Sequence, residues 1–139
     1  MKKIILFILL LGVFSCKKSQ VSDIKIGNTL TENQSYSQNK ILITLIEQVI
    51  KGNTKALSQL IKFDCGSSSG CYDLGSVITQ IIVKIGESKF LVMAKQLDKN
   101  DISTLKGFIS VGLEYGIPIR KNKTNQYVDI EFPLIYKEL

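Results

Sequence analysis

Residues 74–86 read LGSVITQIIVKIG and contain the clearest structural signal in this 139-residue chain. Apolar side chains recur there at intervals of three and four residues over about three turns, at Leu74, Val77, Ile78, Ile81, Ile82 and Ile85. Side chains at this spacing lie on one face of an α-helix, so the stretch predicts an amphipathic helix with that face in the core. Gly86 is a typical residue for the end of such a helix.

The segments on either side show the same helical period. Apolar residues recur at Leu42, Leu45, Ile46 and Val49 before Gly52; at Leu57, Leu60 and Ile61 after a predicted cap at Thr54; at Phe90, Met93, Ala94 and Leu97 after a predicted cap at Ser88; and at Leu105, Phe108, Ile109 and Gly112 before Gly116 and Pro118. The sequence therefore predicts a mainly α domain over residues 40–116, with about five short amphipathic helices in antiparallel hairpins.

Two of the predicted helix–helix turns resemble each other at an offset of 34 residues, GNTKAL at 52–57 and GESKFL at 86–91. A helix-hairpin repeat would produce this similarity. Short helix–helix turns also converge on Gly followed by Ser or Thr, and this second interpretation is the favoured one.

Beyond Pro118 the pattern changes to alternation. Val128, Ile130 and Phe132 are apolar and are separated by acidic residues. Alternation of this kind is typical of a half-buried strand, so residues 117–139 are expected to form a C-terminal β-strand or hairpin. An isolated hairpin is only marginally stable in water, and the segment is therefore expected to pack on the helices.

Residues 16–39 are predicted to be a lipid anchor and a flexible tether. The segment is rich in Ser, Asn, Gln, Thr and Lys, and such a composition buries too little apolar surface to offset the entropy of ordering. About twenty extended residues would hold the domain up to ~70 Å from a membrane. The alternation of Ile24, Lys25 and Ile26 leaves a short strand docked on the domain as the alternative.

The first residues of the chain have the layout of a secretory signal peptide. Lys2 and Lys3 precede an apolar run over residues 4–14. That run fits a signal-peptide core, whereas a bilayer-spanning helix needs ~20 apolar residues. Residues 1–15 are therefore predicted to be a signal peptide, the alternative being an N-terminal helix in which Cys16 is a buried apolar residue.

Val13, Phe14, Ser15 and Cys16 resemble the lipobox of bacterial lipoproteins. Val13 matches the aliphatic position, Ser15 the small position and Cys16 the acylated position, while Phe14 is larger than the residue usual there. The overall layout resembles small envelope lipoproteins of the Bacteroidota. This resemblance implies acylation of Cys16, for example with palmitate, and anchorage in the outer membrane with the domain facing the periplasm. Two or more acyl chains are needed for stable anchoring.

Cys65 and Cys71 enclose the loop GSSSG. With Cys16 acylated, these two cysteines remain, and an exported domain lies in an oxidising compartment, so we expect a structural disulfide. Dithiol oxidoreductases use a Cys-x-x-Cys spacing, which this pair does not have. Zinc would need two further ligands, and the chain contains no histidine.

The absence of histidine also removes the commonest catalytic bases and nucleophile partners. Removal of residues 1–15 would lower the formal net charge from +6 to +4, and the scattered lysines do not favour nucleic-acid binding. Paired carboxylates hydrolyse glycosides without histidine, which makes Asp64, Asp73 and Glu114 candidate catalytic residues. Asp64 is better interpreted as a turn residue, and Asp73 as an N-cap or first-turn residue of the following helix.

Two further pairs have structural interpretations. Tyr72 and Tyr115 are expected at the rim of the core, and Gly107 and Gly112 are expected to allow close helix packing. With no catalytic, metal or cofactor motif, the sequence favours a membrane-anchored lipoprotein with a small, non-catalytic helical domain that binds a protein partner in the envelope. The alternative is a carboxylate-dependent hydrolase or another small periplasmic enzyme.

Overall fold

The computed structural model describes residues 20–119 and 126–139, and this part of the chain is mainly helical with one small antiparallel sheet. The elements are β1 (Gln20–Val21), β2 (Ile24–Lys25), α1 (Asn28–Glu32), α2 (Tyr36–Ile50), α3 (Thr54–Ile61), α4 (Ser68–Ile85), α5 (Glu87–Ala94), α6 (Lys99–Tyr115), α7 (Val128–Glu131) and α8 (Pro133–Glu138). The predicted mainly α fold class is confirmed.

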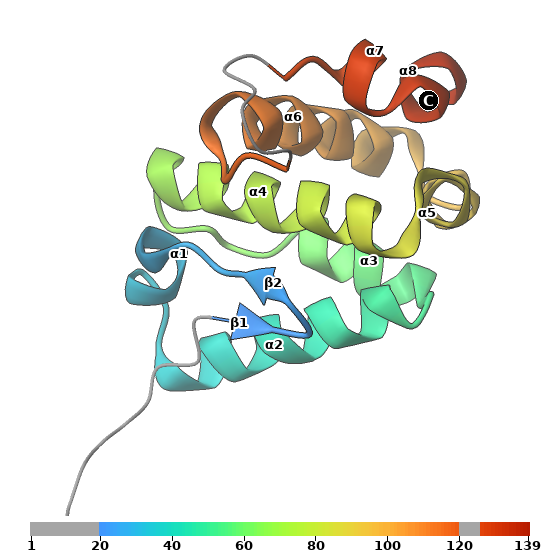
Figure 1. Cartoon of the computed structure of the whole chain (residues 1–139). Helices are drawn as coiled ribbons and strands as arrows, with labels where there is room; N and C mark the ends of the chain where they lie inside the picture. Colours follow the sequence, from blue (N-terminus) through green and yellow to red (C-terminus); the bar gives the residue numbers. More distant parts are fainter. Residues whose placement is uncertain (1–19, 120–125) are drawn as a thin grey trace, which may run out of the picture.

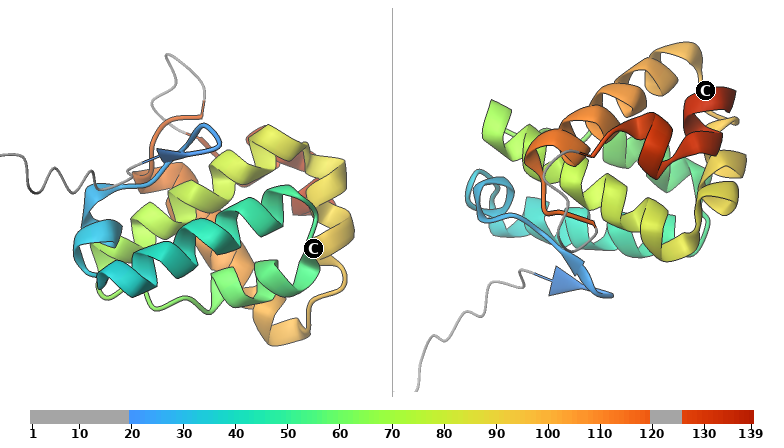
Figure 2. Two further views of the ribbon diagram at one scale, coloured as in Figure 1. Left: turned by 90° about the horizontal axis from the view of Figure 1, so that it is seen from below. Right: turned by 45° about the horizontal axis from the view of Figure 1, so that its top comes forward.

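The helices are arranged in layers around α4. Figure 1 shows α2 and the β-hairpin on one side of α4 and α6 on the opposite side, with α7 and α8 beyond α6. Helix α4 contacts α1, α2, α5, α6 and β2. The other views show the C-terminal helices lying beside α6 and α5 (Figure 2). Because α4 contacts elements on several sides, it is the central helix of the domain.

The sequence of α4 explains its central place. Leu74, Val77, Ile78 and Ile81 are fully buried, and Ile82 is almost so. Burial is not confined to one face, because every residue from Leu74 to Thr79 is buried. The predicted helix is therefore present, but it is buried on more sides than an amphipathic helix would be. Full burial of one large aliphatic side chain contributes roughly 1.5–3 kcal/mol, so this helix supplies much of the core.

Two glycines set the distance between α4 and α6. A Cβ atom at Gly75 would lie 2.5 Å from the Phe108 carbonyl oxygen and 2.9 Å from the Gly112 nitrogen, and one at Gly112 would overlap the Gly75 backbone. The expected close-packing role of Gly112 is thus confirmed. For Gly107 it is wrong, because a Cβ there would meet only open space. The helices approach closely because neither has a side chain at the crossing.

Helix α2 begins at Tyr36 rather than near Lys40, because Ser35 and Gln38 form a reciprocal capping box at its start. The helix N-caps predicted at Thr54 and Ser88 are both wrong. Asn53 caps α3 through its side chain, and α5 begins at Glu87 with no side-chain cap.

Gly52 and Gly86 precede α3 and α5, the two helices of the 34-residue similarity, and have φ angles of +95° and +87°. Only glycine adopts this region readily. The glycine that the two turns share is therefore explained by the local backbone conformation.

The predicted flexible tether is wrong for residues 20–39, which fold onto the domain. Val21 pairs with Ile24 in the β-hairpin, and both are buried together with Ile26 and Leu30. Gln80 of α4 accepts a hydrogen bond from the Lys25 backbone N–H and donates one to the Lys25 carbonyl, each at 2.9 Å. The docked-strand alternative is the correct one, because long-range partners compensate the polar composition.

The predicted C-terminal β segment is also wrong, because residues 128–138 form α7 and α8. Phe132 and Ile135 are buried, while Ile130 is 56% exposed. Val128, Phe132, Ile135 and Leu139 contact the core at a helical spacing of four, three and four residues. The alternation at 127–132 was therefore coincidental. The expectation that this segment packs on the helices is correct: the Leu134 N–H donates to Glu87 of α5 at 2.6 Å.

No helix in the described part of the chain combines the length and the apolar character needed to cross a membrane.

Candidate binding site

The predicted lipobox residues, Val13, Phe14, Ser15 and Cys16, lie outside the described residues, as does the rest of the predicted signal peptide. The candidate features within the described residues are the disulfide loop, the carboxylates and the surface of the helical domain.

Cys65 and Cys71 are joined by a disulfide, with their Cα atoms 5.0 Å apart. Cys65 follows α3 and Cys71 lies in the first turn of α4, so the bridge connects the end of one helix to the start of the next, as the sequence predicts. Asn33 donates to the Ser67 hydroxyl at 2.8 Å. Gln34 donates to the Asp64 carbonyl at 2.6 Å. These bonds tie the loop to the end of α1, which makes it part of the scaffold.

The three candidate catalytic carboxylates do not form one site. Asp64 accepts a hydrogen bond from the Gly66 N–H at 2.9 Å, as a turn residue does. Asp73 accepts one from the Leu30 N–H at 3.0 Å and so caps α1. Its predicted role as a cap of its own helix is wrong, because Ser67 caps α4. Glu114 lies elsewhere, at a surface hollow that includes neither of the other two.

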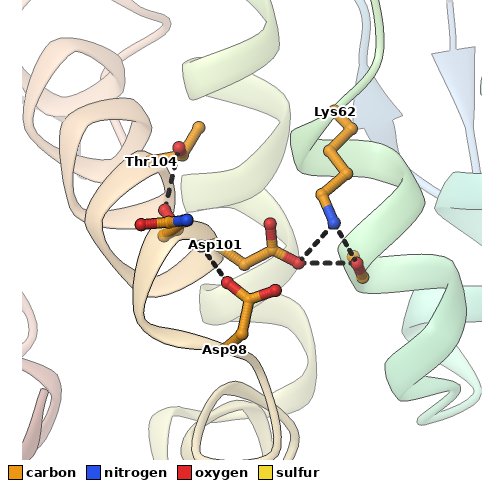
Figure 3. Close-up of polar contacts among 6 residues, drawn as sticks. Lys62, Asp98, Asp101 and Thr104 are labelled. Carbon is orange, nitrogen blue, oxygen red and sulfur yellow. Dashed lines mark hydrogen bonds and ion pairs between the residues drawn. The ribbon is translucent and has the colours of Figure 1, made fainter.

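Sequence reasoning missed a polar cluster that joins α3 to α6 (Figure 3). The Asp101 side chain is only 7% exposed and lies 2.9 Å from the Lys62 ammonium group. Ser58 donates to the same carboxylate oxygen at 2.7 Å, and Asp98 caps α6 by accepting from the Asp101 N–H at 2.8 Å. The hydrogen bonds from Ser58 and Lys62 lower the pKa of Asp101.

Ser58 and Lys62 also lie 3.2 Å apart, an arrangement that resembles a serine nucleophile with a lysine base. A lysine base must be neutral. The hydrogen bond to Asp101 raises the pKa of Lys62 above its usual value, so the ammonium group stays protonated. Only the i, i+4 spacing of Ser58 and Lys62 was visible in the sequence; their common partner is set by the tertiary structure. The cluster therefore links α3 to α6 and has a structural role.

A surface hollow lies between α6 and the C-terminal helices. Its volume is about 440 Å³, and it is lined by Ser110, Glu114, Gln126, Tyr127, Val128, Asp129 and Tyr136. Tyr127 and Tyr136 are 57% and 68% exposed, so their rings border the hollow at the surface. Glu114 and Asp129 add two carboxylates, and among the residues that the structure describes the lining contains neither Lys nor Arg. The described lining therefore combines aromatic rings with two carboxylates. We call these seven residues the α6 hollow.

Tyr115 is linked to the α6 hollow through Glu114. Tyr115 stacks on Tyr72 of α4, with ring centroids 4.6 Å apart. The pKa of Tyr115 is raised, chiefly because its hydroxyl hydrogen-bonds to the Glu114 carboxylate. The prediction that both tyrosines lie at the rim of the core agrees with this position, since Tyr115 is 57% exposed.

One signal in the sequence could have located the α6 hollow. Val128, Phe132 and Ile135 follow a helical period, which would have placed Asp129 and Tyr136 together on the outer side of short helices. Within residues 20–119 and 126–139, no group of three or more His, Cys, Asp and Glu side chains is placed to hold a metal ion.

The carboxylates and ring faces of the α6 hollow make it suited to attracting a cationic group.

Comparison of the chain with protein-family models, with curated proteins and with solved structures found no match.

Proposed function

We propose that this chain is a lipoprotein of the bacterial cell envelope, anchored through acylated Cys16 in the outer membrane, with a non-catalytic binding domain in the periplasm. The basic start, the apolar run and the lipobox-like residues 13–16 support the anchor. The α6 hollow supports the binding role. No nucleic-acid partner and no cofactor form part of the proposal.

The composition of the α6 hollow is the observation behind the binding function. Exposed tyrosines are common at interaction surfaces, because they provide a large apolar ring and a polar hydroxyl. A Lys or Arg side chain gains from ring faces and from carboxylates together. The hollow offers both, through Tyr127, Tyr136, Glu114 and Asp129. We infer that it receives a Lys or Arg side chain from an exposed segment of a partner protein.

The remaining polar clusters support a non-catalytic role. Asp73 caps α1, Asp101 joins α3 to α6, and Lys62 is held protonated by Asp101. Each of these groups has a structural task that explains its position. They are not gathered around a common cavity, as the groups of an active site would be.

One observation favours the alternative, a carboxylate-dependent hydrolase. Glu114 and Asp129 line the same hollow, and two carboxylates across a cavity are the minimum for glycoside hydrolysis. The binding function is the stronger proposal, because the exposed tyrosines and the surface position of the hollow suit contact with a protein segment.

A binding experiment separates the two functions. The acylated full-length protein in vesicles is titrated with synthetic peptides that contain Lys or Arg, and with matched peptides in which these residues are Gln. The double variant Glu114→Gln/Asp129→Asn is expected to lose at least about tenfold in affinity, which corresponds to 1.4 kcal/mol. The control Asp23→Asn/Asp64→Asn removes the same charge from other exposed carboxylates and should bind normally. Equal affinity of both double variants would refute the binding site.

The hydrolase alternative predicts a different outcome. The wild-type protein would release sugar from envelope glycans, and Glu114→Gln would abolish the release. The anchor is tested separately, because Cys16→Ser should prevent labelling by a fatty-acid analogue and release the domain from membranes. Continued membrane retention of Cys16→Ser would contradict the anchor.

A further inference from the structure

The folded domain begins very close to the proposed lipid anchor. Gln20 is paired with Lys25 in the β-hairpin and is therefore a fixed point of the domain. Only four Cα–Cα steps separate it from Cys16, so the connection spans at most ~14 Å. A domain of this length has a radius of gyration of about 14 Å. It cannot be held clear of the bilayer by such a connection, so one face must lie at the lipid headgroups.

The position of β1 identifies the face. β1 contacts α2, and Figure 1 shows the start of β1 beside the first half of α2. The hairpin turn points away from this start, and the elements that border the α6 hollow lie on the opposite side of the α4 layer. The outer side of α2 is therefore, with the hairpin itself, part of the surface close to the start of β1.

The side chains on this part of α2 suit a headgroup layer. Tyr36 is 85% exposed and Ile41 is 52% exposed, although both are large apolar residues. A shallow hollow of about 260 Å³ lies on the same face, lined by Ser37, Lys40, Ile41, Thr44 and Leu45. Tyrosine rings favour the membrane interface, and a lysine at the surface is attracted to anionic lipid while its alkyl chain covers apolar area. The carboxylates nearest in sequence to this face are the exposed Glu32, four residues before Tyr36, and the half-buried Glu47, six residues after Ile41.

We propose that the outer face of α2, marked by Tyr36, Lys40 and Ile41, lies on the headgroup layer of the membrane that anchors Cys16. The proposal rests on the proposed lipid anchor and adds an orientation to it. With α2 on the lipid, the α6 hollow faces away from the membrane and is open to a periplasmic partner.

Site-specific fluorescence tests the orientation. Acylated full-length Ile41→Cys is labelled with an environment-sensitive dye in vesicles of phosphatidylethanolamine and phosphatidylglycerol that contain a headgroup-level quenching lipid. Cys65 and Cys71 are paired and Cys16 is acylated, so the dye reaches only position 41. Val92→Cys on α5 and Val83→Cys beside the hairpin are matched controls, since both residues are exposed valines. We expect a blue-shifted and quenched signal at 41 and an unquenched signal at 92 and 83.

Two further measurements keep the outcomes separate. Flotation with the vesicles reports the anchor, so an acylated protein that does not float overturns the anchor itself. A protein that floats with equal signals at 41 and 92, or with the stronger signal at 83, overturns the proposed face alone. Insertion of about ten Gly and Ser residues between Cys16 and Gln20 should preserve flotation and reduce quenching at 41, because a flexible linker of that length frees the domain. Unchanged quenching would overturn the role of the short connection.

Discussion

Gly75 of α4 and Gly112 of α6 contact each other through their backbones at the crossing of the two helices. The nearest neighbours of a Cβ at either position are main-chain atoms, which cannot rotate away as a flexible side chain can. The crossing is part of the largest helix–helix contact in the described domain. Its geometry therefore determines where α6, and with it Glu114, lies relative to the core.

The crossing predicts opposite effects for two alanine substitutions in the same helix. Gly112→Ala should lower the free energy of unfolding by about 1–3 kcal/mol, because the added methyl group overpacks the contact. Gly107→Ala is the matched control, and should raise it by roughly 0.5–1 kcal/mol, because alanine is the better helix former and its Cβ meets open space. Urea unfolding followed by circular dichroism measures both. Equal effects of the two variants would contradict the observed crossing.

We expect part of the stability of the fold to depend on the ionisation of Asp101 and to be lost in acid. The hydrogen bonds from Ser58 and Lys62 lower its pKa in the folded state. A carboxylate with a lowered folded pKa stabilises the fold above its unfolded pKa of about 4, and this contribution disappears as the pH falls through the folded pKa. Asp101→Asn should therefore be less stable than the wild type by about 1–3 kcal/mol near neutral pH. The difference should vanish in strong acid; a constant difference at every pH would argue against the ion pair.

We expect the loss of the Asp73 carboxylate to destabilise α1 locally. Asp73→Ala removes the acceptor for the Leu30 N–H and should lower the free energy of unfolding by about 0.5–2 kcal/mol. Amide hydrogen exchange at Leu30 should become faster, while Asp73→Asn should keep most of the protection because its side-chain oxygen still accepts. If exchange at Leu30 is unchanged in Asp73→Ala, the capping role is refuted.

The disulfide predicts a stability loss and a clear chemical result. Replacing Cys65 and Cys71 together by alanine should lower the free energy of unfolding by about 2 kcal/mol, because the short loop no longer restricts the unfolded chain. Thiol labelling of the unfolded, unreduced protein should find no free sulfhydryl at these positions. One labelled thiol per cysteine would show that the bridge is absent.

The helical core was predictable because its signal is local and repeated. The residues from Leu74 to Ile85 follow one period for several turns, and so do Leu42 to Val49. Such patterns depend on the geometry of a single helix, which a sequence displays directly. The helix ends were less accurate, since several polar residues compete for each cap, as Asn53 and Thr54 do before α3.

The N-terminal segment and the candidate site depended on contacts that one segment of sequence does not reveal. Residues 20–35 are polar on average, yet Ile24 and Leu30 are buried because Gln80 and Asp73, more than forty residues away, satisfy the nearby backbone. The α6 hollow depends on two short C-terminal helices that an accidental alternation concealed. The absence of histidine narrowed the chemistry from the start but could not place any binding residue.

The hairpin of residues 20–25 has a consequence for the order of folding. Its stabilising partner, Gln80, is separated from Lys25 by 55 residues, and a short hairpin alone is marginal in water. If the chain is exported as proposed, we expect the segment that leaves the export machinery first to become ordered only after α4 has formed. Loop closure over this separation raises the contact order of an otherwise helical domain, which slows folding relative to a simple helical bundle. We therefore expect the residues next to the proposed lipid anchor to be among the last to reach their native contacts.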